Sequence, residues 1–154
     1  MASAAGSTGG ASKVLFICTH NSARSQMAEA FLRHDAGDRF EAFSAGTEPA
    51  TVHPLAVQVM AEQGIDISGQ HAKPFDAFLQ AGFDYVITVC DDANEACPAF
   101  PNARHRLHWG FPDPSRDEGA SEKRLVTFRS VRDAIRARVE EFLTASVSEG
   151  HRPP

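Results

Sequence analysis

The chain has 154 residues, of which 42% are hydrophobic and 23% charged, and its formal net charge is -5. This length suits one domain with its own core, and the acidic balance argues against a nucleic-acid partner, which would require a basic surface. The chain has three cysteines, and an odd number argues against a secreted protein held together by disulfides. No apolar stretch approaches membrane-spanning length. We therefore expect a cytoplasmic protein, not attached to a membrane, with thiols available for chemistry.

In the first half of the chain, apolar runs alternate with helical patterns. Residues 1–12 are mostly small and flexible, with neither a basic start nor an apolar signal core, which predicts a disordered tail. The elements that follow are predicted to be a strand at 14–17, a helix ending near Gly37, a strand at 39–46 and a helix within 52–64.

The second half repeats the alternation and ends in one long helix. The predicted elements are a central strand at 84–90, a short helix at 91–97, a strand at 103–109, a polar loop at 110–121 and an amphipathic helix at about 122–143. We expect one domain over residues 13–146 and a short tail over 147–154. Strands that alternate with helices predict a small doubly wound α/β domain, with a four-stranded parallel sheet flanked by helices.

Cys18 follows the first apolar run directly and precedes a predicted helix. Loop N–H groups that enter a helix converge on an anion, and the helix dipole adds positive potential, which also lowers the pKa of a thiol. Arg24 supplies a planar set of donors suited to a tetrahedral oxyanion. The loop predicted to bind the anion contains Cys18, Thr19, His20, Asn21, Ser22, Ala23, Arg24 and Ser25. The alternative is a buried structural cysteine with Arg24 on a solvated helix face.

Two further cysteines, Cys90 and Cys97, are not explained by anion binding. Cys90 ends the central strand, so it is expected near the same sheet edge as Cys18. Six residues separate Cys90 from Cys97. If they were helical, their Cα atoms would be roughly 10 Å apart, beyond the usual reach of a disulfide. Bond formation would therefore require the intervening segment to rearrange, as in a redox switch.

Three segments carry a resemblance to a known family: "CTHNSARSQMAEAF", "VITVCDDANEACP" and "HWGFPDPSR". Together they resemble the thioredoxin-coupled arsenate reductases, which share the fold of the low-molecular-weight protein tyrosine phosphatases. The resemblance spans residues 13 to about 142. Many of these relatives have an additional cysteine where this chain has Ala23.

The resemblance implies a role for each matching residue. Cys18 falls on the nucleophile, Arg24 on the anion-binding arginine, Asn21 on a residue that shapes the loop, and Ser25 on the hydroxyl that stabilises the thiolate. Asp113 falls on the general acid. Cys18, Cys90 and Cys97 would act in that order as a thiol–disulfide relay that reduces arsenate to arsenite in arsenic detoxification, with phosphate or sulfate as competing anions. Thioredoxin would regenerate a monomeric enzyme that needs no cofactor.

A potassium site in some of these relatives corresponds to Asn21, Glu29 and Ser44, together with an aspartate whose position here is Lys73. An ammonium group has the charge and about the size of potassium. We therefore expect Lys73 to pair with Glu29 in place of the ion, against the plainer alternative of an exposed surface lysine.

Two other functions compete with arsenate reduction. Cys90, Cys97, His105 and His108 are four possible zinc ligands, but neither spacing is typical of zinc modules. A low-molecular-weight protein tyrosine phosphatase would use the Cys18 loop, Arg24 and Asp113 alone. The phosphatases usually have tyrosines after the Asp-Pro pair, whereas this chain has Ser115 and Arg116, and Cys90 and Cys97 would then have no role.

Overall fold

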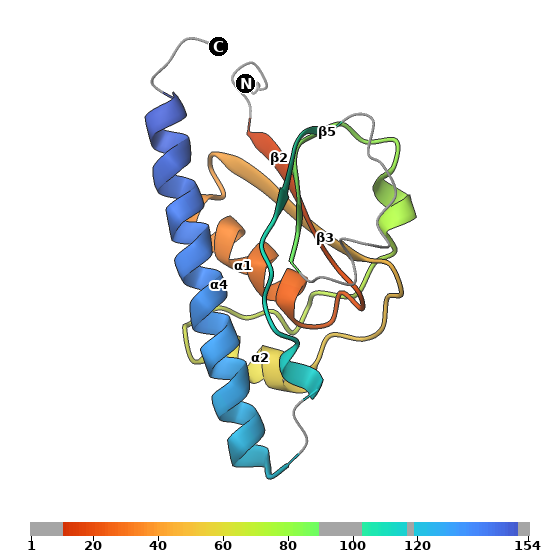
Figure 1. The fold of residues 1–154 in the computed structure, drawn as a ribbon, viewed down its shortest axis with the longest axis vertical. Coiled ribbons are helices and arrows are strands. Elements are labelled where there is room, and N and C mark those ends of the chain that lie inside the picture. Colours follow the sequence, from red (N-terminus) through yellow and green to blue (C-terminus); the bar gives the residue numbers. More distant parts are fainter. Residues whose placement is uncertain (1–10, 90–102, 117–118, 151–154) are drawn as a thin grey trace.

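The computed structural model describes residues 11–89, 103–116 and 119–150. Within them, four strands form one parallel sheet in the order β3-β2-β4-β5 (Figure 1). The strands are β2 (Ser12–Cys18), β3 (Phe40–Gly46), β4 (Phe83–Thr88) and β5 (Ala103–His108). The predicted α/β class and the parallel sheet are confirmed.

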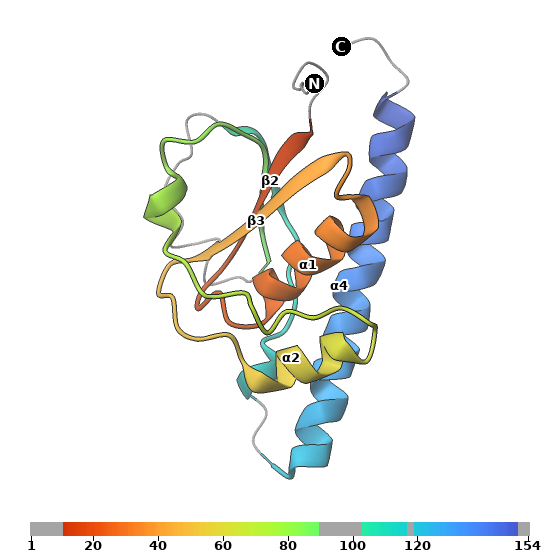
Figure 2. The ribbon, with the colours of Figure 1, turned by 180° about the vertical axis from the view of Figure 1, so that it is seen from behind.

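Three α-helices and two short 3-10 helices complete the described structure. They are α1 (Arg24–Ala36), α2 (Pro54–Ala61), η1 (Phe75–Phe78), η2 (Pro114–Arg116) and α4 (Ser121–Gly150). Helix α1 packs on β2, β3 and α4, and α2 packs on α4 (Figure 2). None of the helices in the described ranges is long and apolar enough to span a membrane.

Helix α4 has the predicted buried stripe but a different end. Phe128, Ile135 and Val139 are fully buried, as their spacing predicts. The helix continues to Gly150, past the predicted end at Leu143 and the expected domain boundary, because no proline or glycine interrupts the chain between those two residues.

Helix α1 is buried more completely than its sequence predicts. Met27 and Phe31 lie on the predicted apolar face and are fully buried, but Gln26 and Glu29 are buried too. Because buried polar side chains must find polar partners inside the protein, Gln26 and Glu29 need hydrogen-bond or ion-pair partners there. Those partners belong to the candidate active site.

Candidate active site

The loop between β2 and α1 lies at the carboxyl edge of the sheet, where Cys18 pairs with Gly46 at the end of β3. Its carbonyl groups accept N–H bonds from the segment after β3: Glu48 to Thr19 at 2.8 Å, Ala50 to His20 at 2.9 Å and His53 to Ser22 at 2.8 Å. Ala23, at the N-cap of α1, has no oxygen in its side chain to cap the helix. The loop carbonyl groups are thus bonded to the segment after β3, and the N-terminus of α1 that follows the loop has no side-chain cap. Such a loop is suited to binding an oxyanion through its N–H groups.

The shape of the loop depends on two backbone positions. Asn21 has φ 51°, a left-handed conformation that asparagine adopts more readily than most residues. Gly46 packs so closely behind the loop that a Cβ atom there would lie 2.8 Å from the Thr19 carbonyl oxygen and 2.9 Å from the Asn21 nitrogen. Only glycine allows β3 to approach the loop this closely.

The Cys18 thiol is buried and has a hydroxyl beside it. Its Sγ lies 2.9 Å from Ser25 Oγ, and Ser25 Oγ accepts a hydrogen bond from Asn21 Nδ2 at 2.7 Å. The Ser25 hydroxyl can donate its hydrogen to the sulfur while its oxygen accepts from Asn21, an arrangement that would stabilise a Cys18 thiolate.

Arg24 connects the loop to the segment before η2. The side chain is 9% exposed; its Nη1 donates to the Phe111 carbonyl at 3.1 Å, and its Nη2 lies 3.6 Å from Asp113 Oδ2. The structure therefore brings Cys18, Arg24 and Asp113 to one site, although Asp113 is far from the other two in sequence.

Ser115 is a site residue that the sequence analysis treated only as a departure from the phosphatase pattern. Its backbone N–H and its hydroxyl both donate to Asp113 Oδ1, at 2.9 Å and 2.7 Å. These bonds fix the carboxyl group with Oδ2 on the side of Arg24. An aspartate followed two residues later by serine is a known turn pattern, so the signal was present in the sequence.

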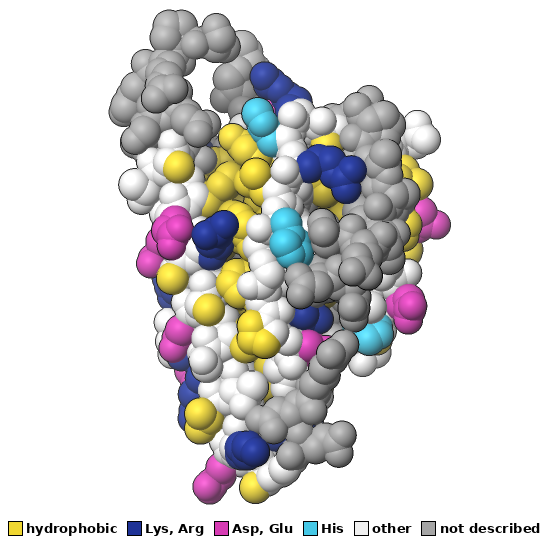
Figure 3. Space-filling view, in the orientation of Figure 1, with side chains coloured by type: hydrophobic (Ala, Val, Ile, Leu, Met, Phe, Trp, Pro, Cys, Tyr) yellow, Lys and Arg dark blue, Asp and Glu magenta, His cyan; other side chains and the backbone are white. Residues whose placement is uncertain are grey.

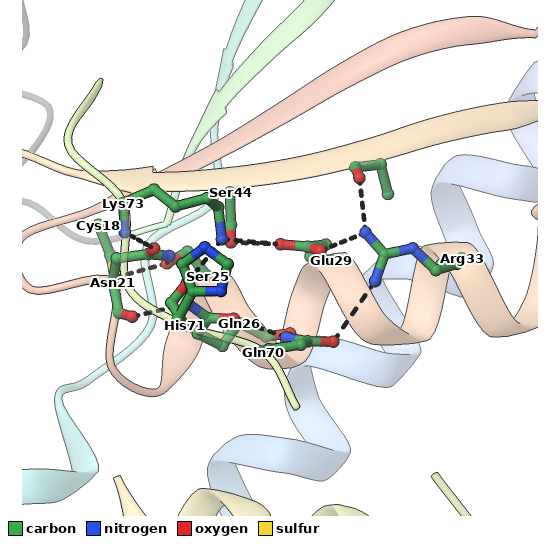
Figure 4. A network of polar contacts seen from close by, with 11 residues as sticks. Cys18, Asn21, Ser25, Gln26, Glu29, Arg33, Ser44, Gln70, His71 and Lys73 are labelled. Carbon is green, nitrogen blue, oxygen red and sulfur yellow. Dashed lines mark hydrogen bonds and ion pairs between the residues drawn. The ribbon is translucent and has the colours of Figure 1, made fainter. Parts of the chain in front are cut away.

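Beneath the loop, a buried polar network ties α1 to the segment before η1 (Figure 4). Gln26 Nε2 donates to the carbonyl oxygens of Asn21 at 2.9 Å and His71 at 3.0 Å, and Gln70 Nε2 donates to Gln26 Oε1 at 2.6 Å. The Lys73 backbone N–H donates to Asn21 Oδ1 at 2.8 Å. The loop that contains Asn21 is thus supported by residues about fifty positions away in sequence.

The residues that the resemblance assigns to a potassium site are in contact here, with Lys73 among them. The Ser44 hydroxyl donates to Glu29, Arg33 forms an ion pair with Glu29, and Lys73 Nζ lies 3.9 Å from Glu29 Oε1 and donates to the His71 carbonyl at 2.8 Å. The Lys73 side chain is only 23% exposed, and its burial lowers its pKa, opposed by the charge of Glu29. The Lys73 ammonium group thus lies beside Glu29 and is partly shielded from solvent.

Cys90 and Cys97, expected at the same sheet edge, lie outside the described residues. The zinc alternative needs both of them and can be examined only at its two histidines. His105 stacks on Tyr85 with ring centroids 5.0 Å apart, and His108 Nδ1 lies 2.6 Å from Thr88 Oγ1. Three positions apart on β5, the two histidines point to opposite faces of the sheet. Among the described residues, no group of three metal-ligating side chains occurs.

Comparison with known proteins agrees with this geometry. Residues 13–152 match the model of the low molecular weight phosphotyrosine protein phosphatase family. An arsenate reductase of Shouchella clausii is 46% identical over 129 residues, which cover 84% of this chain and 93% of that protein.

Solved structures give the same relationship. An arsenate reductase in its phosphate-binding state superposes with a TM-score of 0.75 at 36% identity, covering 87% of this chain and 98% of that one. A thioredoxin-dependent arsenate reductase from Corynebacterium glutamicum gives a TM-score of 0.68 at 36% identity, covering 88% of this chain and 61% of that one. The chain therefore belongs to the low-molecular-weight phosphotyrosine protein phosphatase family, among its arsenate reductases.

Proposed function

We propose that this protein is an arsenate reductase that converts arsenate to arsenite and is regenerated by thioredoxin. The observation that carries the proposal is the site built from Cys18, Arg24 and Asp113 in a chain 46% identical to an arsenate reductase. The relay depends on Cys90 and Cys97 as well, and it requires a compartment that keeps thiols reduced, such as the cytoplasm.

In the first step, the Cys18 thiolate attacks arsenic in an arsenate held by the loop N–H groups and Arg24. A sulfur–arsenic bond forms, one arsenic–oxygen bond breaks, and the oxygen leaves as water after Asp113 protonates it. We assign the proton to Asp113 Oδ2, because Ser115 binds Oδ1 and Oδ2 is the oxygen on the Arg24 side. Arsenic stays pentavalent in this step.

In the second step, the Cys90 thiolate attacks Cys18 Sγ. A Cys18–Cys90 disulfide forms, the sulfur–arsenic bond breaks, and its electron pair passes to arsenic, which leaves as arsenite. Cys97 then attacks Cys90, releases the Cys18 thiolate and forms Cys90–Cys97. A dithiol donor, which we take to be thioredoxin, reduces the Cys90–Cys97 disulfide by exchange, is itself oxidised to a disulfide, and restores both thiols. The naming of a thioredoxin-dependent relative supports this choice of donor.

A cation beneath the loop completes the proposal. The Lys73 side chain supplies this cation as an ammonium group beside Glu29. The Lys73 backbone N–H supports the loop by donating to Asn21. The enzyme then needs no potassium ion for activity.

A phosphatase is the second candidate, because phosphate and arsenate have nearly the same shape and the family model is that of phosphatases. Such an enzyme would use Cys18, Arg24 and Asp113 and would have no need of Cys90 or Cys97. Purified protein assayed for phosphate-ester hydrolysis and for reductant-dependent arsenate consumption separates the two. We expect arsenate consumption that stops without a dithiol donor; fast ester hydrolysis with no arsenite formed would support the phosphatase.

The order of the relay is tested by trapping its first disulfide. Cys97→Ser removes the thiol that resolves Cys18–Cys90, so this crosslink should accumulate after arsenate treatment, and one arsenite should form per chain. Peptide mapping under non-reducing conditions measures the crosslink, and Cys90→Ser serves as the control that cannot form it. If the Cys97→Ser variant released arsenite and no Cys18–Cys90 crosslink were found, the proposed order would be wrong.

A further inference from the structure

His53 connects the anion loop to two helices. Its backbone N–H donates to the Ser22 carbonyl in the loop at 2.8 Å. Its side chain is the N-cap of α2, where Nδ1 accepts a hydrogen bond from the Leu55 N–H at 3.0 Å. Its ring packs against Phe128 of α4, with centroids 4.7 Å apart and Phe128 fully buried.

The capping bond depends on the protonation state of the ring. To accept from Leu55, Nδ1 must offer a lone pair, so the ring is neutral with its proton on Nε2. An imidazolium has no acceptor, and the cap is lost when it forms. The usual capping residues, Ser, Thr, Asp and Asn, accept the same bond without titrating near neutral pH.

The surroundings of His53 favour the neutral ring. Burial lowers the pKa of His53, Arg124 of α4 lowers it further, and Asp113 opposes both. Among the described residues, Arg124 and Asp113 are the charged groups that act on it. Contact with the Phe128 ring acts in the opposite direction, because an aromatic ring attracts a cation.

We propose that His53 is a positioning residue of the anion loop: its neutral ring caps α2 and thereby holds Ser22 and the loop in their anion-binding shape, and its protonation loosens them. The inference rests on the anion-binding role proposed above for the Cys18–Ser25 loop. It adds a dependence on pH that comes from the N-cap of α2, outside the groups assigned to the reaction, Cys18, Arg24 and Asp113.

Sulfate binding tests the proposal without any redox chemistry. Sulfate remains a dianion over the whole range, so its affinity, measured by calorimetry from about pH 8 to about pH 5.5, reports the titration of the protein alone. The variants are His53→Asn, which keeps a capping oxygen that does not titrate, and His53→Ala, which has none. His34→Asn is the control, since His34 is an exposed histidine at the end of α1.

We expect the affinity of the wild type to fall more than that of His53→Asn as the pH drops. The extra loss should be roughly twofold to thirtyfold, the range that loss of an N-cap produces in an equilibrium constant. His53→Ala should bind weakly at both ends of the range, and His34→Asn should follow the wild type. The midpoint of the extra loss should coincide with the titration of the His53 ring followed by NMR.

Three results would overturn the proposal: the same pH dependence in His53→Asn as in the wild type, wild-type affinity in His53→Ala at both ends, or a midpoint away from the His53 titration. If His53→Ala does not fold, the comparison of His53→Asn with the wild type decides. A wild type that does not bind sulfate at any pH would refute the anion-binding loop itself, which is a separate outcome.

Discussion

Asp113 and Ser115 illustrate how a site residue depends on its neighbour. Ser115 gives two hydrogen bonds to one oxygen of Asp113, which leaves the other oxygen directed toward Arg24. The chain contains a second copy of this turn: the Ser68 N–H and hydroxyl both donate to Asp66 Oδ1, at 2.9 Å and 2.6 Å. The second turn is exposed and separate from the site, so it provides a control for the first.

Asp113→Asn should slow formation of the thiol–arsenate adduct by ~10²–10⁴, the loss typical of a positioned general acid. Ser115→Ala should slow the same step by only about threefold to tenfold, because one neutral hydrogen bond that orients the acid is lost. Single-turnover arsenate consumption measures the rates, while sulfate affinity should stay near the wild-type value. Ser68→Ala should change neither. An Asp113→Asn variant with an undiminished rate would show that another group is the acid.

At the scale of elements, the segment 70–73 serves as a brace between α1 and the anion loop. Gln70 binds Gln26, the His71 carbonyl accepts from Gln26, and Lys73 binds Asn21 through its backbone and approaches Glu29 with its side chain (Figure 4). Glu29 has a second cation, Arg33, which is half exposed at the far end of the network. The carboxylate is therefore not left alone when Lys73 is removed.

Replacing potassium with another monovalent cation at constant ionic strength should leave wild-type turnover and melting temperature unchanged. Lys73→Asp should make both respond to potassium, since it adds an acidic oxygen beside Glu29 and removes the ammonium. Lys73→Met is the neutral comparison and should cost only about 1 kcal/mol of unfolding free energy, because the pair is long and Arg33 remains. Specific stimulation of the wild type by potassium would contradict the proposed role of Lys73.

At the scale of the whole molecule, ion pairs hold α4 against α1 and α2. Arg129 and Arg132 of α4 pair with Glu62 at the end of α2, at 2.7 Å and 2.8 Å, and Arg136 reaches Asp35 of α1 at 3.3 Å. On the face in Figure 3, basic side chains and histidines lie along β5, and apolar side chains lie between β5 and α4. The ion pairs join α4 to α1 and α2, and aromatic contacts of Phe142 with Phe40 and Tyr85 join it to the sheet.

The Glu62→Gln variant should have a lower melting temperature than the wild type at neutral pH, and this difference should disappear in acid. Its hydrogen bond to Arg129, with a smaller one from Arg132, lowers the pKa of Glu62 from 4.5 to about 2. A carboxyl group whose pKa is lower in the folded than in the unfolded chain stabilises the folded state at pH values above its unfolded pKa. The contribution of Glu62 is therefore complete above pH 4.5 and is lost as the pH falls toward about 2. Thermal unfolding across this range measures it, with Glu140→Gln as the exposed control. A difference between Glu62→Gln and wild type that is independent of pH would disprove the linkage.

Much of this fold can be predicted from local patterns in the sequence. Continuous apolar runs indicate buried parallel strands, and the spacing of Phe128, Ile135 and Val139 indicates the buried stripe of α4. Cys18 and Arg24 could also be placed together, because a thiol at a strand end and an arginine at a helix start share one short loop. Residues this close in sequence are joined by local geometry alone.

Tertiary structure decided which distant segments meet. Asn21 and Lys73 are 52 residues apart, yet the backbone of one binds the side chain of the other. Gln26 and Glu29 are buried where α1 meets the segment 70–73 and β3, which no helical period reveals. His53, at the start of α2, likewise meets distant residues, since Ser22 accepts its backbone N–H and Phe128 packs against its ring. The amino-acid sequence by itself determined the elements and the reactive loop, because both depend on short-range periodicity and spacing. The supports of that loop were settled only by the packing of the chain, because a polar side chain can hydrogen-bond only to the groups that the fold brings within reach.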